Sequence, residues 1–248
     1  MEVFERVSTG ISKLDQMLGG GLLRGRTYLI SGETGAGKTI LSLQFILDGL
    51  RNDEQCIYVS LDERIEGVLR GALSLGWNFW EYIDKGLFYP FEFRLYAEDL
   101  RRFGKESKAF VDALARIAKG KSITRIVLDP ISALAAGAKE ELVIREYLRE
   151  IVNMIEERLG ATTLMTCDIP TGSNKLSRFG FEEFLSAGVI VLGITRFYGK
   201  LLKTIYVRKM RWSKVDPAIY TFEIRPVEGV VILEPLSEEL DKSMIGGP

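Results

Sequence analysis

Histidine is absent from this chain of 248 residues, and cysteine occurs only twice. Without histidine the chain lacks the usual general base and the commonest zinc ligand, so acid–base chemistry falls to carboxylates, lysines or water. Cys56 and Cys167 each lie in an apolar stretch that predicts a strand. Because two thiols are too few for a metal site, we expect both to be buried structural thiols.

Long apolar runs and a charge of one sign are also missing. No run approaches the ~20 apolar residues that span a bilayer, and residues 1–6 lack the layout of a secretion signal. The formal net charge is −1, so no global field draws the chain to nucleic acid or membrane. We expect a cytoplasmic protein without a membrane partner, and any contact with a polyanion has to come from a local patch.

The chain does contain a complete phosphate-loop motif, G-x-x-x-x-G-K-T. Residues 26–31 before it predict a buried strand, and residues 40–47 after it have apolar side chains at helical spacing. In this setting the glycines turn backbone N–H groups toward a phosphate, which the start of the helix also attracts. Lys38 is expected to reach the β- and γ-phosphates, and Thr39 to ligate Mg²⁺. The predicted nucleotide-binding residues are Gly32, Glu33, Thr34, Gly35, Ala36, Gly37, Lys38 and Thr39.

Strand and helix patterns alternate through most of the chain, which predicts an α/β fold with a mostly parallel sheet covered on both faces. From residue 189 onward, strand-like segments follow one another without a helix, so we expect an antiparallel β-rich C-terminal edge. We interpret residues 1–240 as one domain and 241–248 as a frayed tail. The strands predicted after the loop are 55–60, 125–129, 162–167, 189–194, 201–209, 219–224 and 230–233, and the helices are 64–75, 105–119 and 140–159.

A magnesium-organising carboxylate is expected at the end of an apolar strand. Ile126, Val127 and Leu128 deliver Asp129 to the sheet edge, where Pro130 ends the strand. An aspartate that closes a strand also serves as a turn or helix cap. The phosphate loop upstream favours the metal role.

Two further pairs of charged residues are candidates for chemistry. Asp62 and Glu63 follow the second strand at the edge where ligands bind in open α/β sheets, and either is a candidate base for an attacking water. They serve equally well as first-turn acids of the helix that follows. Lys209 and Arg211 project from one face of a predicted strand, where they either grip a phosphate or keep an edge strand from aggregating.

These motifs together resemble RecA-like ATPases, most closely the KaiC/RadA branch. The resemblance also includes residues 8–25 and the stretch Arg178-Phe179-Gly180-Phe181-Glu182-Glu183-Phe184, which is similar to the R-x-G-x-E-E-F segment of KaiC domains. The resemblance implies a ring-shaped or helical assembly with ATP at each subunit interface, and identifies Asp62 and Glu63 with the tandem acidic pair. The first acid, the family's usual base, is an aspartate here, so either residue can position the water. The resemblance also identifies Lys209-Met210-Arg211 with the K-x-R element that reaches a neighbour's γ-phosphate.

The sequence differs from both KaiC and the RadA-type recombinases. KaiC carries two such domains, and the hydroxyl pair of its autokinase domain falls at Glu183 and Phe184, so a clock-type phosphorylation cycle is not expected. RadA-type recombinases carry an additional N-terminal DNA-binding domain. The biological role therefore stays open.

Our leading hypothesis is an Mg²⁺-dependent ATPase that assembles into a ring, expected to be a hexamer, and acts on an unidentified partner. One alternative is a single-stranded nucleic-acid motor whose central loops are 132–139 and 169–179, the second carrying Lys175 and Arg178. The other is a nucleotide-gated binding protein with negligible hydrolysis. In that case the aromatic segment 77–82 is either a partner surface or core and subunit contact.

Overall fold

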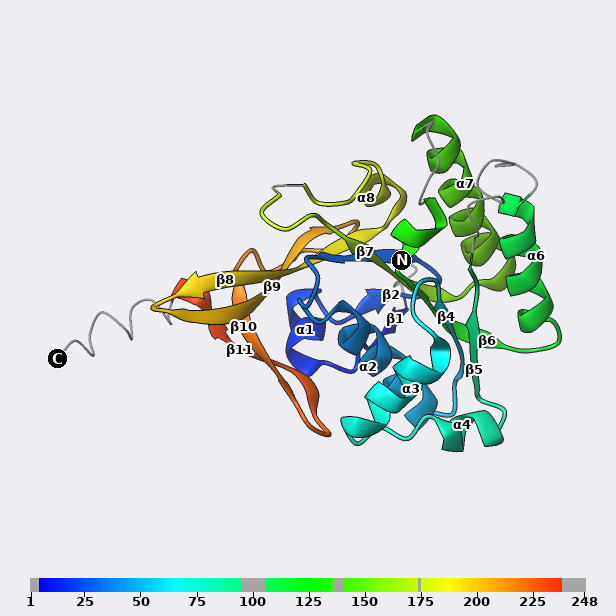
Figure 1. Cartoon of the computed structure of the whole chain (residues 1–248), viewed down its shortest axis with the longest axis horizontal. Coiled ribbons are helices and arrows are strands. Elements are labelled where there is room, and N and C mark those ends of the chain that lie inside the picture. The colour runs from blue at the N-terminus through cyan, green and yellow to red at the C-terminus, as the bar shows by residue number, and fades with distance from the viewer. Residues whose placement is uncertain (1–4, 95–105, 136–140, 174, 238–248) are drawn as a thin grey trace.

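A nine-stranded sheet with helices on both faces forms the centre of the molecule (Figure 1). The computed structural model describes residues 5–94, 106–135, 141–173 and 175–237, so the predicted tail at 241–248 lies outside the described residues. The strand order is β11-β10-β9-β8-β3-β7-β6-β4-β5. The six strands from β8 to β5 run parallel, and β9, β10 and β11 continue the sheet antiparallel. The predicted α/β fold with an antiparallel C-terminal edge is confirmed.

The strands of the large sheet are β3 (Thr27–Gly32), β4 (Gln55–Ser60), β5 (Phe88–Glu92), β6 (Ile123–Asp129), β7 (Thr162–Asp168), β8 (Gly188–Phe197), β9 (Lys200–Met210), β10 (Tyr220–Arg225) and β11 (Gly229–Pro235). The helices are α1 (Ser12–Met17), α2 (Lys38–Arg51), α3 (Ile65–Ser74), α4 (Trp80–Asp84), α6 (Glu106–Ala118), α7 (Glu141–Asn153) and α8 (Glu182–Leu185). Among these residues no helix is both long and apolar enough to cross a bilayer.

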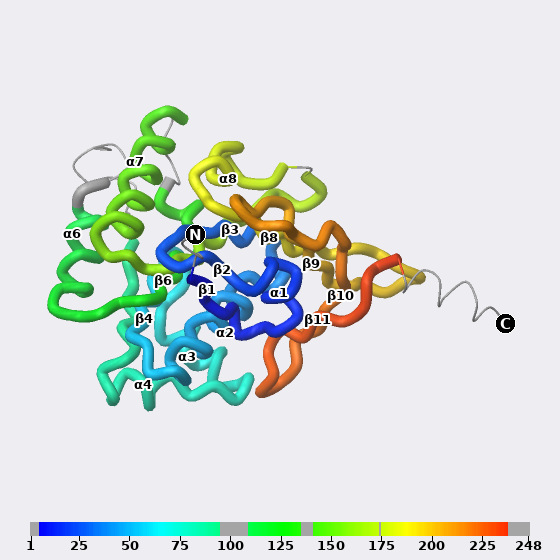
Figure 2. The backbone as a smooth tube through the Cα atoms, turned by 180° about the vertical axis from the view of Figure 1, so that it is seen from behind, coloured from blue at the N-terminus to red at the C-terminus, as the bar shows by residue number. Residues whose placement is uncertain are grey.

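Alternating side chains of the parallel strands build two separate cores. In β3, Tyr28 and Ile30 join the core under α2 and α3, whereas Leu29 between them joins the core under α6 and α7. A strand buried on both faces explains why the parallel strands read as continuous apolar runs. Two short antiparallel strands, β1 (Arg6–Val7) and β2 (Leu22–Leu23), precede and follow α1 in the chain and are seen from behind in Figure 2.

Three local features differ from the sequence prediction. Residues 88–92, for which no strand was predicted, form a parallel edge strand, β5, paired with β4. The helix predicted for 140–159 is α-helical to Asn153 and then continues as a π-helical segment, Met154–Leu159. β8 is antiparallel to β9, as predicted, but pairs parallel with β3 on its other side.

The aromatic segment 77–82 belongs mainly to the core. Trp77 and Phe79 are buried, and the Trp77 ring donates a hydrogen bond from its indole nitrogen to the Val227 carbonyl, at 2.8 Å. For these two side chains the structure therefore agrees with the core interpretation and not with the partner surface.

Candidate functional site

The phosphate loop connects the central strand β3 to helix α2. Gly35 and Gly37 have φ of 80° and 105°, in the left-handed region that side chains with a Cβ rarely adopt. At Gly37 an added Cβ would also lie 3.2 Å from Ile224 of β10. α2 begins at Lys38 and has 14 residues, so its positive end faces the loop. The local structure is the strand, glycine loop and helix that the motif predicts.

Lys38 is buried and bound to its own loop. Its ammonium donates to the carbonyls of Gly32 and Glu33, at 3.0 and 2.9 Å, and lies 2.7 Å from Oδ1 of Asp168. Asp168 is the last residue of β7, next to β3 in the sheet. A phosphate that takes up Lys38 must therefore replace these three oxygens.

Thr39 and Asp129 lie together, as the metal-site prediction requires. The Thr39 hydroxyl donates to Oδ2 of Asp129 at 2.8 Å, and the Tyr58 hydroxyl donates to the same oxygen at 2.6 Å. Thr166 donates to Oδ1. Burial and the nearby negative charge of Asp129 raise the pKa of Tyr58 well above its ordinary 10.0, so this phenol stays a donor.

The donor set at Asp129 fits Mg²⁺. Hard oxygen ligands from one carboxylate and one hydroxyl, with phosphate and water supplying the rest, are what this ion takes in nucleotide sites. The hydrogen bonds that the structure shows for the Asp129 carboxylate come from side-chain hydroxyls. They give no support to the alternative of a backbone cap.

Asp62 and Glu63 line the same cavity as Lys38, Thr39 and Asp129. The cavity has a volume of about 440 Å³ and opens beside the phosphate loop. Both acids are exposed and precede α3, which begins at Ile65, so they are not first-turn residues of that helix. The Glu63 carboxylate nonetheless lies over the first turn, 3.0 Å from the position of an added Cβ at Gly67.

Sequence reasoning missed two charged side chains at this site. Asp168 lines the cavity. It ends an apolar strand just as Asp129 does, so the same sequence pattern could have identified it. Lys203 of β9 donates a hydrogen bond from its ammonium to the Gly35 carbonyl. No sequence signal pointed to Lys203, because only the pairing of β8 with β3 brings β9 near the loop.

Lys209 and Arg211 lie together but away from this cavity. The Lys209 ammonium donates to the carbonyls of Glu183 and Ser186, both at 2.7 Å, and Arg211 donates to the Phe184 carbonyl at 3.2 Å. Both cations thus lie at α8, and neither is among the described residues that line the cavity. Partial burial and then the charge of Arg211 lower the pKa of Lys209.

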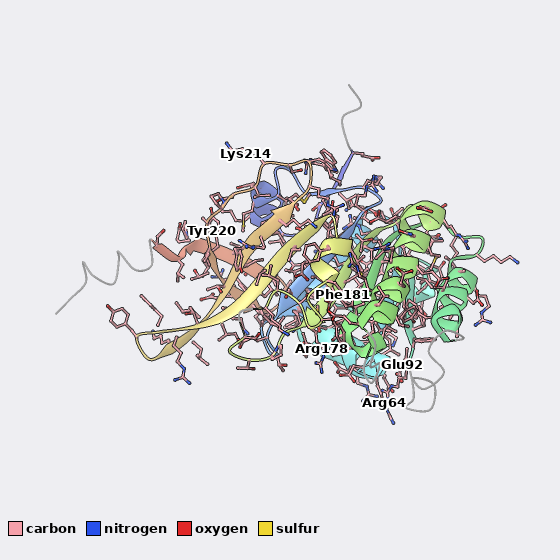
Figure 3. All side chains as sticks on the ribbon, turned by 90° about the horizontal axis from the view of Figure 1, so that it is seen from above. Arg64, Glu92, Arg178, Phe181, Lys214 and Tyr220 are labelled. Atoms are coloured by element: carbon pink, nitrogen blue, oxygen red, sulfur yellow. The ribbon has the colours of Figure 1, made fainter. Side chains whose placement is uncertain are left out.

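The loop from β7 to α8 joins the two groups of residues. The Glu33 carboxylate accepts the Gly172 backbone N–H at 3.0 Å, and Ser31 donates to the Leu176 carbonyl. Lys175 and Arg178 are exposed on this loop, and Arg178 is labelled in Figure 3. The other loop predicted to contact nucleic acid, 132–139, lies partly outside the described residues.

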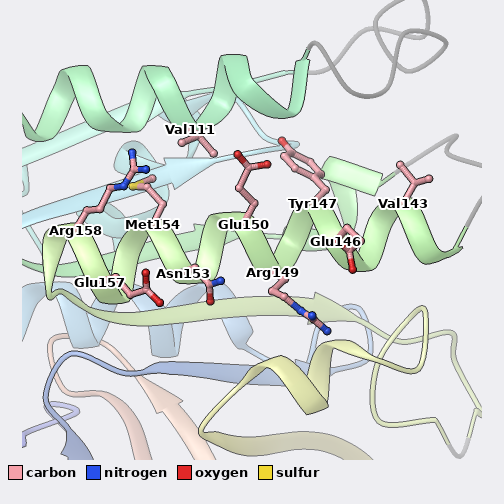
Figure 4. A pocket seen from close by; sticks show the side chains of 10 residues that line it. All are labelled: Val111, Val143, Glu146, Tyr147, Arg149, Glu150, Asn153, Met154, Glu157 and Arg158. Carbon is pink, nitrogen blue, oxygen red and sulfur yellow. The ribbon is translucent and has the colours of Figure 1, made fainter.

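Two features are separate from the site. A second cavity, of about 480 Å³, lies between α6 and α7 beside Tyr147, Glu150 and Met154 (Figure 4). None of the predicted site residues is among those that line it. Cys56 and Cys167 are buried free thiols, as predicted, and burial raises the pKa of both.

Comparison with known proteins agrees with this geometry. The chain is similar to a KaiC-like protein of known structure from the hyperthermophilic archaeon Pyrococcus horikoshii, with a TM-score of 0.81 and 33% sequence identity over 94% of this chain and 100% of that one. It is 28% identical to the circadian clock oscillator protein KaiC of Thermostichus vulcanus over 222 residues, 89% of this chain and 43% of the relative. It is 26% identical to the clock protein KaiC3 of Synechocystis sp. over 240 residues, 96% of this chain and 47% of the relative.

The fold is therefore that of the RecA-like ATPases, with the nucleotide motif at the end of the central strand. The sequence profile of the KaiC ATPase family matches residues 7–237, so the chain belongs to that family. It spans less than half the length of the clock proteins it matches. Family membership supports nucleotide binding and ATPase chemistry.

Proposed function

We propose that this protein is an Mg²⁺-dependent ATPase that assembles into a ring, with each ATP held between two subunits. One observation carries the proposal: the phosphate loop, Asp129, Asp62 and Glu63 line one cavity, whereas Lys209 and Arg211 lie outside it. We further propose that residues 1–240 form a single ATPase domain.

In this mechanism the residues of one subunit bind the nucleotide. Lys38 leaves Asp168 and the loop carbonyls and binds the β- and γ-phosphates, while the loop N–H groups hold the remaining phosphate oxygens. Asp62 or Glu63 accepts a proton from the water that attacks the γ-phosphorus. The bond from phosphorus to the bridging oxygen breaks, and ADP leaves with the electron pair.

Thr39 and Asp129 would hold Mg²⁺, through the Thr39 hydroxyl and, directly or through water, the Asp129 carboxylate. Bound there, the ion neutralises the negative charge that develops on the phosphate oxygens. Tyr58 and Thr166 orient the Asp129 carboxylate through their hydrogen bonds, which restricts its rotation.

The cations at α8 are proposed to act on the neighbouring subunit's nucleotide. Lys209 and Arg211 are held by backbone carbonyls rather than by carboxylates, so their charge is not neutralised by a partner in the ion pairs that the structure shows. Phe184 and Trp212 beside them are 62% and 81% exposed. Exposed aromatic side chains beside an arginine are residue types that are enriched in protein interfaces.

Mixing two inactive variants tests both parts of the proposal. Lys38→Ala should lose nucleotide binding, and Lys209→Ala/Arg211→Ala should keep binding but lose phosphate release. In a one-to-one mixture, about a quarter of the interfaces combine an intact loop with intact cations, so about a quarter of the wild-type turnover should return. As a control, the triple variant Lys38→Ala/Lys209→Ala/Arg211→Ala supplies no intact cations. Its mixture with Lys209→Ala/Arg211→Ala should therefore regain no turnover.

Two results would contradict the proposal in different ways. If mass measurement in solution shows that the diluted protein is a monomer and this monomer is fully active, the proposed ring is wrong. Wild-type protein that binds ATP tightly without phosphate release above background would instead favour the nucleotide-gated binding protein.

A further inference from the structure

The hairpin of β8 and β9 extends beyond the rest of the sheet. β3 pairs with β8 only as far as Leu192, and β10 pairs with β9 only from Lys203 to Ile205. Residues 195–202, here called the ribbon, therefore form ladder pairs only with each other. Figures 1 and 3 show the ribbon projecting from the body of the molecule.

Apolar side chains occupy the apex of this ribbon. Tyr198 and Leu201 are 74% and 68% exposed, and the Tyr198 ring packs edge-on against Phe197 with 4.8 Å between centroids. The turn consists of Tyr198 and Gly199, with φ of 42° and 76°, and a left-handed conformation is unusual for tyrosine. Folding alone gives no reason for an exposed apolar apex on a two-stranded ribbon.

Charge on this hairpin is of one sign only. From Phe184 to Val215 the sequence contains no Asp or Glu but carries Lys or Arg at seven positions, in a chain whose net charge is −1. Arg196 and Lys200 are exposed directly behind the apex. Cations on an exposed ribbon edge protect against aggregation, but that role does not account for Tyr198 and Leu201.

We propose that the ribbon is a docking site for an anionic lipid surface. Tyr198 and Leu201 would enter the interfacial region of the bilayer, while Arg196 and Lys200 bind lipid phosphates at the level of the headgroups. This contact is peripheral and comes from a local patch, and the small net charge of the chain, −1, does not oppose it. It depends neither on ATP hydrolysis nor on the proposed ring.

Shape and size favour a lipid over a nucleic-acid strand. The six apex residues, from Arg196 to Leu201, line a hollow of about 390 Å³ that combines two cations with apolar walls. A phospholipid is complementary to this hollow, because it joins one compact phosphate anion to apolar acyl chains. A single strand instead needs a cationic groove that follows several nucleotides, on the order of four or more per site.

Vesicle co-sedimentation tests the proposal with the full chain. Wild-type protein should bind vesicles of phosphatidylcholine with 40% phosphatidylglycerol at least tenfold better than pure phosphatidylcholine, and binding should weaken with added salt. Tyr198→Ser/Leu201→Ser and Arg196→Gln/Lys200→Gln should each lose at least tenfold. The matched controls are Val227→Ser, an apolar residue exposed to 62%, and Arg51→Gln/Lys119→Gln, two exposed cations elsewhere.

The unfolding midpoint of each variant and its ATP binding should match wild type, which separates lost docking from lost folding. Equal vesicle binding by the apex variants and wild type, or no preference for the anionic vesicles, would overturn the proposal. Apex-dependent binding of an oligothymidylate without vesicle binding would also overturn it, and would assign the ribbon to nucleic acid.

Discussion

Asp168 holds the ammonium of Lys38 at 2.7 Å, in the place where the phosphates of a nucleotide are expected to bind it. The carboxylate therefore competes with the ligand for the lysine and also repels the negative charge of the phosphates. Asp168 lies at the end of β7, and its side chain is about one-third exposed, at 34%. This partial exposure limits the strength of the ion pair.

Asp168→Asn should tighten nucleotide binding. The amide keeps the shape of the side chain but removes its charge, which corresponds to about 0.5 to 1 kcal/mol for a pair of this exposure, or about two- to fivefold in Kd. Titration of a fluorescent ADP analogue without Mg²⁺ measures the change. Glu66→Gln, at an exposed ion pair of α3, is the control and should leave Kd unchanged. Weaker binding by Asp168→Asn would show that Asp168 supports the site.

Arg125 should be far more important for stability than an exposed arginine. It is 2% exposed, and its guanidinium pairs with Glu54 and Asp48 at 2.9 and 3.0 Å. Burial raises the pKa of Glu54, but the hydrogen bonds from Arg125 and Thr124 and the positive charge of Arg125 together outweigh that effect, so the pKa is lowered. Arg125→Met leaves these acids without their cation and should cost about 3 to 5 kcal/mol in urea unfolding.

Arg70→Met is the matched control for this change. Arg70 pairs with Glu66 at 2.7 Å, but the two side chains are 73% and 69% exposed. The distance is as short as in the buried pairs, yet solvent screens the charges, so we expect almost no change in stability. Equal losses of stability in the two variants would show that burial does not decide the strength of these ion pairs.

Two glycines should respond to alanine in opposite directions. Gly71 lies inside α3, with open space around an added Cβ, so Gly71→Ala should stabilise the protein by about 0.5 to 1 kcal/mol. Gly35 also has open space, but its φ of 80° is left-handed, so Gly35→Ala should destabilise by about 1 to 2 kcal/mol. Urea unfolding measures both effects. If both variants were stabilised, the space around the added Cβ, not the backbone conformation, would decide the change in stability.

Stability should fall above about pH 9 because of the two buried thiols. Burial raises the pKa of Cys56 and Cys167 above the ordinary 9.0, so the folded state keeps protons that the unfolded chain releases. Above this pH the unfolded state binds fewer protons than the folded state. The free energy of unfolding therefore falls by up to about 1.4 kcal/mol per thiol for each pH unit. Urea unfolding at pH 8, 9 and 10 with a reductant measures the slope. A Cys56→Ala/Cys167→Ala variant with the same slope would contradict the assignment.

The sequence predicts those parts of the fold in which local pattern and burial agree. Apolar runs buried on both faces identified β4 and β6, and the glycine motif located the start of α2. β5 was missed because its residues FYPFE combine aromatics with a proline, which is tolerated at the edge of a sheet but breaks the strand pattern.

Within the site, contacts between residues far apart in the chain are the part that the sequence does not predict. Thr39 and Asp129 were expected at one site because each has a recognisable local setting, and the structure joins them by a hydrogen bond. Their role as Mg²⁺ ligands stays a prediction. Lys203 could not be placed, because its contact with Gly35 depends on strand order. Lys209 and Arg211 were expected on one face, and their shared contact with α8 agrees with that expectation. Whether they act on a neighbour stays a prediction.

The position of β3 in the sheet has a consequence for biosynthesis. Its two neighbours, β7 and β8, come from residues 162–197, so the strand that carries the phosphate loop has no sheet partner until most of the chain has been made. Such non-local pairing forms late and slowly. We therefore expect nascent chains shorter than about 200 residues to be retained poorly on ATP-agarose. Nucleotide capture would then report that a newly made chain has finished folding.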